Sequence, residues 1–310
     1  MLRLVLLLSV CSAAIGCGGG GPPEFTAPPV RVVCTTTIVA DVVKHVGKER
    51  VAVETLMGPG VDPHRYLPTA GDREQLEGAH LVFFNGLHLE GKMTDTFEKS
   101  RRRFRAFAVT RDISERDLRP ADTDGGAHDP HVWFDVKLWA KSIDPIRAEL
   151  AKLDPGGAAF YMTNANDYRQ ELDKLDAEVR AAAGTLPKER RVLVTGHDAF
   201  GYFGRAYGFE VRGLQGVSTA SEVGTTDRDR LAEFLGAQRV PAVFTETSVP
   251  DEGLKAVLDT TRQKYGHTVR LVGGDDALYS DALGAPTSPG GTYAGMVRHN
   301  IKVIVDALSK

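Results

Sequence analysis

Residues 157–183 read GAAFYMTNANDYRQELDKLDAEVRAAA. Apolar residues recur in this stretch at spacings of four, three, four and four, at Tyr168, Leu172, Leu175, Val179 and Ala183. This period places the five side chains on one face of an α-helix. The helix would be longer than the roughly three to four turns that are usual in globular proteins. We therefore predict that it joins two separate parts of the chain.

Strand and helix patterns alternate on both sides of this helix. The predicted strands span residues 31–36, 51–57, 81–85 and 105–109 before it, and 191–195, 210–214, 242–245 and 268–272 after it. The predicted helices span 38–47, 69–78, 90–103 and 135–153 before it, and 199–207, 227–237, 252–265 and 293–309 after it. Pro145 falls inside the helix predicted for 135–153 and is expected to kink it.

This alternation is typical of parallel sheets covered by helices. We predict an α/β fold with an N-terminal lobe at residues 31–155, a linking helix at 156–186 and a C-terminal lobe at 187–310. Ligands of open α/β sheets bind outside the carboxyl ends of the strands, so a cleft between the lobes is the expected site. A single stiff helix should permit only a small opening of that cleft.

The first residues look like an export signal. A positive residue, Arg3, precedes a short apolar run, and residues 14–17 read AIGC, which looks like a bacterial lipobox. We expect a signal peptide at 1–16, a lipidated Cys17 that anchors the protein to the membrane, and a tether at 17–30. An ordinary secretory signal with an incidental cysteine is the alternative. Either places the protein in the periplasm or on the outer face of the cytoplasmic membrane.

The composition excludes several classes of protein. The chain has 310 residues and a formal net charge of −3, with no dominant basic patch, so nucleic acid is not an expected partner. If Cys11 leaves with the signal and Cys17 carries lipid, only Cys34 remains, and the mature domain has no disulfide. We expect a monomer.

The candidate chemistry lies in histidines at strand ends and loops. His64 and His131 each follow an Asp-Pro pair, His197 follows the strand predicted for 191–195, and Asp281 lies beyond the strand predicted for 268–272. Three imidazoles and a carboxylate suit a divalent transition metal. Proline stiffens the backbone before each of the first two histidines. A lone loop histidine is usually solvated, and His128 is left open as a spare ligand or a plain loop residue.

Four motifs in a fixed order carry a family resemblance: DPHRY at 62–66, DPHVW at 129–133, HDAFGYF at 197–203 and SDA at 280–282. Together they resemble the metal-binding solute receptors of zinc and manganese ABC importers, the TroA-like, ZnuA-like and PsaA-like lipoproteins of solute-binding protein family 9. The segments GLQGVSTASE at 213–222 and GTYAGMVRHNI at 291–301 favour the TroA-like branch. The resemblance covers essentially the whole mature chain.

The resemblance implies two lobes bridged by one backbone helix, with a metal ion between them. By motif position, the ligands would be His64, His131, His197 and Asp281. Manganese-preferring relatives often carry Glu where His197 stands, whereas many zinc-specific relatives carry a long His-rich loop. Here residues 121–130, ADTDGGAHDP, contain a single histidine. The expected ion is therefore Zn²⁺ or Mn²⁺, with the choice open.

The function expected on this basis is that of a substrate-binding protein that captures the ion and delivers it to the permease of an ABC importer. Such a protein is not an enzyme. A metallohydrolase with a His-rich site is one alternative, although it would need an open coordination position and a catalytic signature such as HExxH. A surface adhesin and a receptor for an organic solute are the others, since fold alone does not choose between them.

Overall fold

The computed structural model describes residues 21–91, 93–94, 97, 101–121, 127–221 and 223–309. The predicted signal peptide, Cys17 and the first part of the tether lie outside the described residues, as do parts of the helix predicted for 90–103 and of the 121–130 loop. Among the described residues, no helix combines the length and apolarity needed to cross a bilayer.

The first lobe is built on a parallel sheet whose strand order is β2-β1-β3-β4. Its strands are β1 Val30–Cys34, β2 Val51–Thr55, β3 Leu81–Phe84 and β4 Ala106–Ala108. Its helices are α1 Thr37–Gly47, α2 Ala70–Gly78, α4 Arg101–Phe104, α5 Val136–Trp139 and α6 Ile143–Leu153, with short 3₁₀ turns between several of them. Thr69 begins α2 with a reciprocal capping box to Asp72, as its sequence position predicts.

The second lobe repeats this arrangement. Its sheet has the order β6-β5-β7-β8, and all of its strand pairs are parallel. The strands are β5 Val192–His197, β6 Glu210–Gln215, β7 Ala242–Phe244 and β8 Arg270–Val272. The helices are α8 Gly201–Tyr207, α9 Thr225–Ala237, α10 Glu252–Tyr265 and α11 Tyr293–Leu308. The predicted fold of two parallel-sheet lobes is therefore correct.

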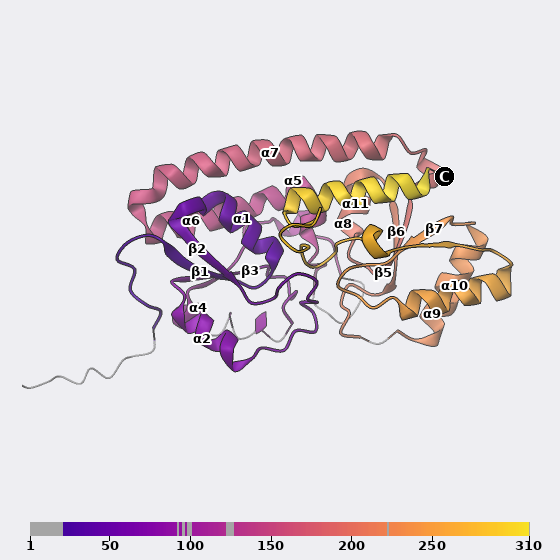
Figure 1. Ribbon diagram of the computed structural model, residues 1–310, viewed down its shortest axis with the longest axis horizontal. Coiled ribbons are helices and arrows are strands. Elements are labelled where there is room, and N and C mark those ends of the chain that lie inside the picture. The colour runs from indigo at the N-terminus through magenta and orange to yellow at the C-terminus, as the bar shows by residue number, and fades with distance from the viewer. Residues whose placement is uncertain are drawn as a thin grey trace, which may run out of the picture.

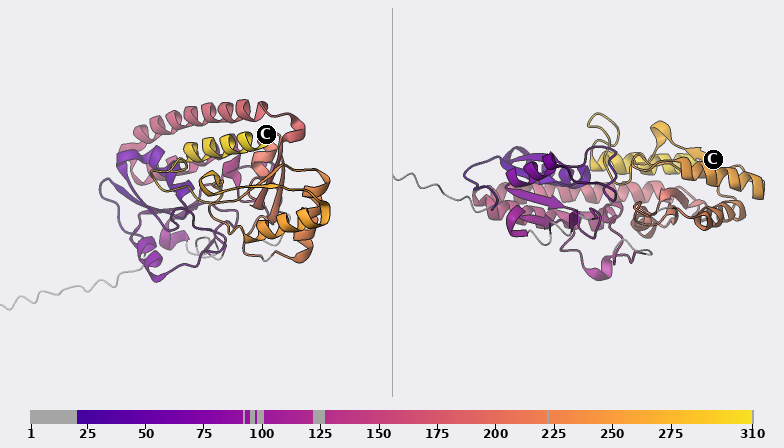
Figure 2. Two further views of the ribbon diagram at one scale, coloured as in Figure 1. Left: turned by 45° about the vertical axis from the view of Figure 1, so that its right-hand side comes forward. Right: turned by 90° about the horizontal axis from the view of Figure 1, so that it is seen from below.

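One helix, α7 (Ala158–Gly184), runs along both lobes (Figure 1). Every residue of its predicted apolar stripe is buried. The C-terminal helix α11 lies beside α7, and the further views keep the two helices side by side (Figure 2). A single hydrophobic core cluster includes residues of both lobes and of α7 and α11, so the lobes pack as one body.

Three direct contacts join the lobes close to the expected cleft. The rings of Phe134 and Phe200 stack with their centroids 4.2 Å apart. The hydroxyl of Tyr202 donates to the carbonyl oxygen of Asp129 at 2.9 Å. The hydroxyl of Tyr293 donates to the carbonyl oxygen of Trp133 at 2.6 Å. Because all three side chains from the second lobe are buried, a wide swing of one lobe would expose a large apolar surface.

The prediction of one helix over residues 135–153 is wrong in one respect. It is divided into α5 and α6 by a 3₁₀ turn at Ala140–Ser142. Pro145 therefore lies in the first turn of α6 rather than in the interior of one longer helix. A proline costs little there because a residue in the first turn has no helical acceptor for its amide. Asp135 caps α5 as expected, since its side chain accepts a hydrogen bond from the amide of Leu138.

Candidate metal centre

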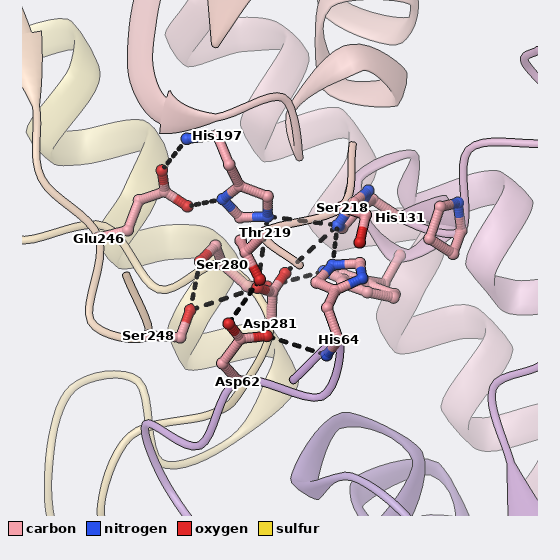
Figure 3. A network of polar contacts seen from close by, with 12 residues as sticks. Asp62, His64, His131, His197, Ser218, Thr219, Glu246, Ser248, Ser280 and Asp281 are labelled. Atoms are coloured by element: carbon pink, nitrogen blue, oxygen red, sulfur yellow. Dashed lines mark hydrogen bonds and ion pairs between the residues drawn. The ribbon is translucent and has the colours of Figure 1, made fainter. Parts of the chain in front are cut away.

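The structure brings all four predicted residues to one place between the lobes (Figure 3). His64 lies on the loop that follows β2, and His131 directly precedes a 3₁₀ turn at Val132–Phe134. His197 is the last residue of β5 rather than a loop residue after it. Asp281 lies on the connection between β8 and α11. Each lobe therefore supplies two of the four side chains.

The spacing of these side chains fits a small cation. One donor atom from each of the four residues lies within 4.8 Å of the others. The Nε2 atom of His131 lies 3.2 Å from Nε2 of His64, 3.4 Å from Nε2 of His197 and 3.4 Å from Oδ1 of Asp281. Ligands at about 2.0–2.1 Å from a tetrahedral zinc stand about 3.3–3.4 Å apart. The three edges that meet at His131 therefore match those around a tetrahedral ion, and the remaining edges of the cluster are no longer than 4.8 Å.

Burial and charge set the protonation of the histidines. His131, His197 and Asp281 are fully buried, whereas His64 is partly exposed. Burial lowers the pKa of His64 to about 3, so its ring is neutral and can act as a ligand at neutral pH. Burial also opposes a charge on His131, but hydrogen bonds with Asp129 and Asp281 outweigh it and raise its pKa to about 9.

The carboxylate of Asp281 is held in its charged form. Burial alone would raise its pKa, but the positive charge of His197 and the hydrogen bond with His131 lower the pKa well below the ordinary value. Within the described chain, its buried Oδ1 atom lies 3.4 Å from Nε2 of His131, and it has no donor once that ring nitrogen is deprotonated to bind a metal. A buried carboxylate oxygen without a donor is costly unless a cation is bound, so this atom supports a metal ligand.

The two Asp-Pro-His units share one local geometry. Oδ1 of Asp62 accepts the amide of His64 at 2.9 Å, and Oδ1 of Asp129 accepts the amide of His131 at 3.0 Å. Each aspartate thus closes a turn that begins at its own residue, which the following proline stiffens. Asp129 also accepts a hydrogen bond from Nδ1 of His131 at 2.8 Å, which points the Nε2 lone pair at the site.

Glu246 is a functional residue that our sequence reasoning missed. Its Oε1 accepts the amide of His197 at 2.9 Å, and its Oε2 lies 2.6 Å from Nδ1 of the same histidine. Burial disfavours a charge on His197, but Glu246 and Asp281 raise its pKa well above the ordinary value. The available signal was its place just after β7, at the carboxyl end of the same sheet that presents His197.

Trp133 links the two halves of the site. Its indole nitrogen donates to the carbonyl oxygen of Ser280 at 3.0 Å, directly before Asp281. Its ring lies edge-on to that of His131, with centroids 5.2 Å apart. Ser248 contacts the Oγ of Ser280 at 2.7 Å and Oδ2 of Asp281 at 3.4 Å. The ligand loops of both lobes are thereby fixed to each other.

Four other histidines have structural partners. A ring nitrogen of each lies within hydrogen-bond distance of the backbone: His45 with Asp41 O, His80 with Arg31 N, His267 with Val240 O and His299 with Ala277 O. His88 and His128 instead line a small cavity beside His64. Neither belongs to the group of donor atoms that could share one ion. His128 is therefore a residue of the loop and not a fifth member of the site.

Residues 32–307 match the family model described as ZnuA, zinc-uptake complex component A, periplasmic. The chain is 50% identical to the zinc-binding protein TroA of Treponema pallidum over 282 residues. The aligned residues cover 90% of this chain and 89% of that protein. A solved structure of the periplasmic zinc-binding protein TroA from Treponema pallidum matches with a TM-score of 0.86 and 48% identity. That match covers 92% of this chain and all of the other.

Two further relatives have names that refer to manganese. The manganese-binding lipoprotein MntA of Bacillus subtilis is 42% identical over 305 residues, which cover 98% of each chain. The manganese ABC transporter substrate-binding lipoprotein PsaA of Streptococcus anginosus is 30% identical over 319 residues, which cover 99% of this chain and 98% of the other. The similarity to each relative therefore extends over nearly the whole chain.

Proposed function

Because the chain belongs to the ZnuA family of periplasmic zinc-uptake components, we propose that His64, His131, His197 and Asp281 bind the ion that it carries to a membrane importer. The protein is a substrate-binding protein of a metal ABC transporter, the role that the name of PsaA states. The observation that carries the ligand assignment is the largely buried cluster of four donor atoms, in which Nε2 of His131 lies 3.2–3.4 Å from a donor atom of each other residue.

The donor set favours capture over catalysis. A catalytic zinc keeps one coordination position for water, whereas a closed site fills all four with side chains. Here four side chains each offer one donor atom, and three of the four are fully buried. A metallohydrolase would need an open corner and a nearby general base for its water. We therefore infer that the ion is cargo and takes part in no reaction on this protein.

The cargo is Zn²⁺ or Mn²⁺. Three imidazoles in a tetrahedron suit zinc. Both carboxylate oxygens of Asp281 face the histidines, since Oδ1 lies 3.4 Å from His131 and Oδ2 lies 3.3 Å from His197. A carboxylate that binds through both oxygens would supply the additional oxygen ligand that manganese favours. In vitro, zinc should displace manganese from this site whichever ion is physiological.

We further propose that the protein works outside the cytoplasmic membrane as a monomer, anchored by a lipid on Cys17. The support is the lipobox-like sequence AIGC at 14–17 and the word lipoprotein in the names of two relatives. The permease of the importer is the expected partner. Mass spectrometry of the mature N-terminus would test the anchor, and an unmodified Cys17 would rule it out.

Elemental analysis tests the proposed ligand set. Protein purified without added metal should contain close to one equivalent of zinc or manganese, and titration with zinc should displace manganese. A fourfold variant that replaces His64, His131, His197 and Asp281 by Ala should purify free of both ions while keeping its helical circular dichroism. Retention of a full equivalent of metal in that folded variant would remove the assignment.

A further inference from the structure

The ion needs a route to its site that the packing of the lobes does not obviously provide. Three of the four proposed ligands are fully buried, and the contacts of Phe200, Tyr202 and Tyr293 hold the lobes together. Opening the whole cleft would break all of these contacts at once. A local opening next to His64, the one partly exposed member of the set, would break far fewer.

The ring of His64 is also held less firmly than the other two. Nδ1 of His131 is fixed by Asp129 at 2.8 Å, and Nδ1 of His197 lies 2.6 Å from Glu246. No side-chain carboxylate among the described residues lies within ion-pair distance of the His64 ring. The ring of His64 can therefore turn about its side-chain bonds without breaking such a contact, which suits the first and last ligand that the ion meets.

The segment that covers His64 comes from the opposite lobe. Residues 216–221 connect the end of β6 toward α9, and Val217 and Ser218 of this segment line the small cavity beside His64. That cavity measures about 10 Å³, roughly the space for a single water molecule. An ion can pass it only if one of its walls moves.

There is room for residues 216–221 to move. A surface cavity of about 640 Å³ lies against the same segment and is lined by Gly216, Val217 and Ser221 together with β6 and α9. The start of the segment is anchored, because the amide of Asp198 donates to the carbonyl oxygens of Gln215 and Gly216 at 3.1 and 3.3 Å. The middle of the segment can thus move while its start stays in place.

One hydrogen bond connects the middle of this segment to the first lobe. The hydroxyl of Thr219 donates to Oδ2 of Asp62 at 2.6 Å, and Oδ1 of the same carboxylate accepts the amide of His64 (Figure 3). Within the described chain, no other hydrogen bond joins residues 217–220 to the first lobe. Thr219 is buried, and Asp62 supplies no donor atom to the metal set. Breaking this bond would therefore free the segment without removing a ligand.

We propose that residues 216–221 form a gate over His64 and that the Thr219–Asp62 hydrogen bond keeps it shut. Thr219 is then a positioning residue that sets the rate of metal exchange and touches no metal. The gate must open for the ion to enter and again for it to leave. Loss of the bond should therefore speed both steps and change the equilibrium affinity little. This inference rests on the proposed function of metal capture.

The test compares Thr219→Val, which removes the hydroxyl and keeps the shape, with Thr219→Ser, which keeps the hydroxyl. Stopped-flow mixing with Zn²⁺ gives the association rate, and mixing of zinc-loaded protein with excess chelator gives the dissociation rate. Trp133, which lies against His131, can serve as the fluorescent reporter. A hydrogen bond to a charged group corresponds to about tenfold or more in rate, so Thr219→Val should raise both rates by about that factor.

Two control variants isolate the contribution of the Thr219 hydroxyl. Thr219→Ser should behave like the unmodified protein, as should Thr261→Val, which removes a buried hydroxyl that bonds only within α10, to the carbonyl oxygen of Val257. Thermal melts establish that each variant is folded, and Thr219→Ala replaces Thr219→Val should the latter not fold.

The measured rates and affinities decide whether the gate exists. Unchanged rates in the folded Thr219→Val protein would overturn it. A faster release with an equally weakened affinity would also overturn it, because Thr219 would then only support the bound state. An unmodified protein that binds no zinc at all would instead refute the proposed function.

Discussion

Asp62-Pro63-His64 and Asp129-Pro130-His131 are the same tripeptide, and in both the aspartate accepts the amide of its histidine. They differ in what else the carboxylate contacts. Asp129 accepts a hydrogen bond from the ring of its own His131, whereas Asp62 accepts one from Thr219 of the opposite lobe. One unit fixes the ring of a proposed ligand, and the other couples a less constrained proposed ligand to the proposed gate. The same short motif therefore serves two tasks, which its surroundings decide.

The strongest test of this contrast removes the fixed ligand. The Nε2 atom of His131 neighbours the donor atoms of all three other ligands, at 3.2–3.4 Å. His131→Ala should therefore lower zinc affinity by more than the roughly 10–100-fold that loss of a supporting partner causes. Competition titration against a chelator of known affinity measures the change. His128→Ala, which changes a histidine three residues earlier in the chain, is the matched control and should bind zinc normally. A near-normal zinc affinity of the His131→Ala protein would exclude His131 as a ligand.

The two aspartates should differ when each is replaced by asparagine. Asp129→Asn removes the charged acceptor that orients the ring of His131 and should lower zinc affinity about 10–100-fold. Asp62→Asn keeps an oxygen for the amide of His64 and should lower affinity less, while it speeds metal exchange. Equilibrium titrations measure the zinc affinity of both variants, and chelator-driven release measures their rates of metal exchange. Equal losses of affinity would mean that the two units do not differ in their tasks.

Zinc affinity should also depend on pH, by at most about tenfold per unit for each proton displaced. An ordinary histidine has a pKa of about 6.5, but that of His131 is raised to about 9 and that of His197 is also raised. Metal must displace these protons, so zinc affinity should keep rising from pH 6.5 to about 9 instead of levelling off near 7. Titrations in weakly coordinating buffers would show this, and a plateau from pH 7 would contradict it.

The same shift has a consequence for the metal-free protein. A raised pKa stabilises the fold below the unfolded value of about 6.5, and this contribution is lost as pH rises through the folded value of about 9. The melting temperature of chelator-treated protein should therefore fall between pH 6.5 and 9, while the increase on adding zinc should grow. A metal-free melting temperature that stays level over this range would contradict the raised pKa.

The linking helix could be predicted from a local pattern because it is long and regular. The apolar stripe from Tyr168 to Ala183 is sufficient to predict α7, since each of its positions faces the same core. The division between α5 and α6 could not be predicted, because nothing in the sequence shows that Pro145 lies in the first turn of a helix rather than in the middle of one. The joint core of the two lobes was not readable either, since it depends on contacts such as Phe134 with Phe200 that lie far apart in the chain.

The site was predictable where the sequence carries a distinctive pattern. The repeated Asp-Pro-His unit drew attention to His64 and His131, and the order of the motifs supplied His197 and Asp281. Glu246 carries no such pattern, because a glutamate after a strand is common and its partner His197 is distant in sequence. The different contacts of Asp62 and Asp129 also needed the structure, since the two tripeptides are identical in sequence.

The placement of α11 bears on how the chain matures. The proposed ligands occur in the order 64, 131, 197 and 281, and the loop that holds Asp281 is kept in place by α11, whose Asn300 hydrogen-bonds the backbone of Tyr279. A polypeptide made and exported from its N-terminus thus has its three histidines outside long before the carboxylate joins them. On the proposed ligand assignment, the complete set forms only when α11 docks, so we expect full-strength metal binding only in the finished molecule.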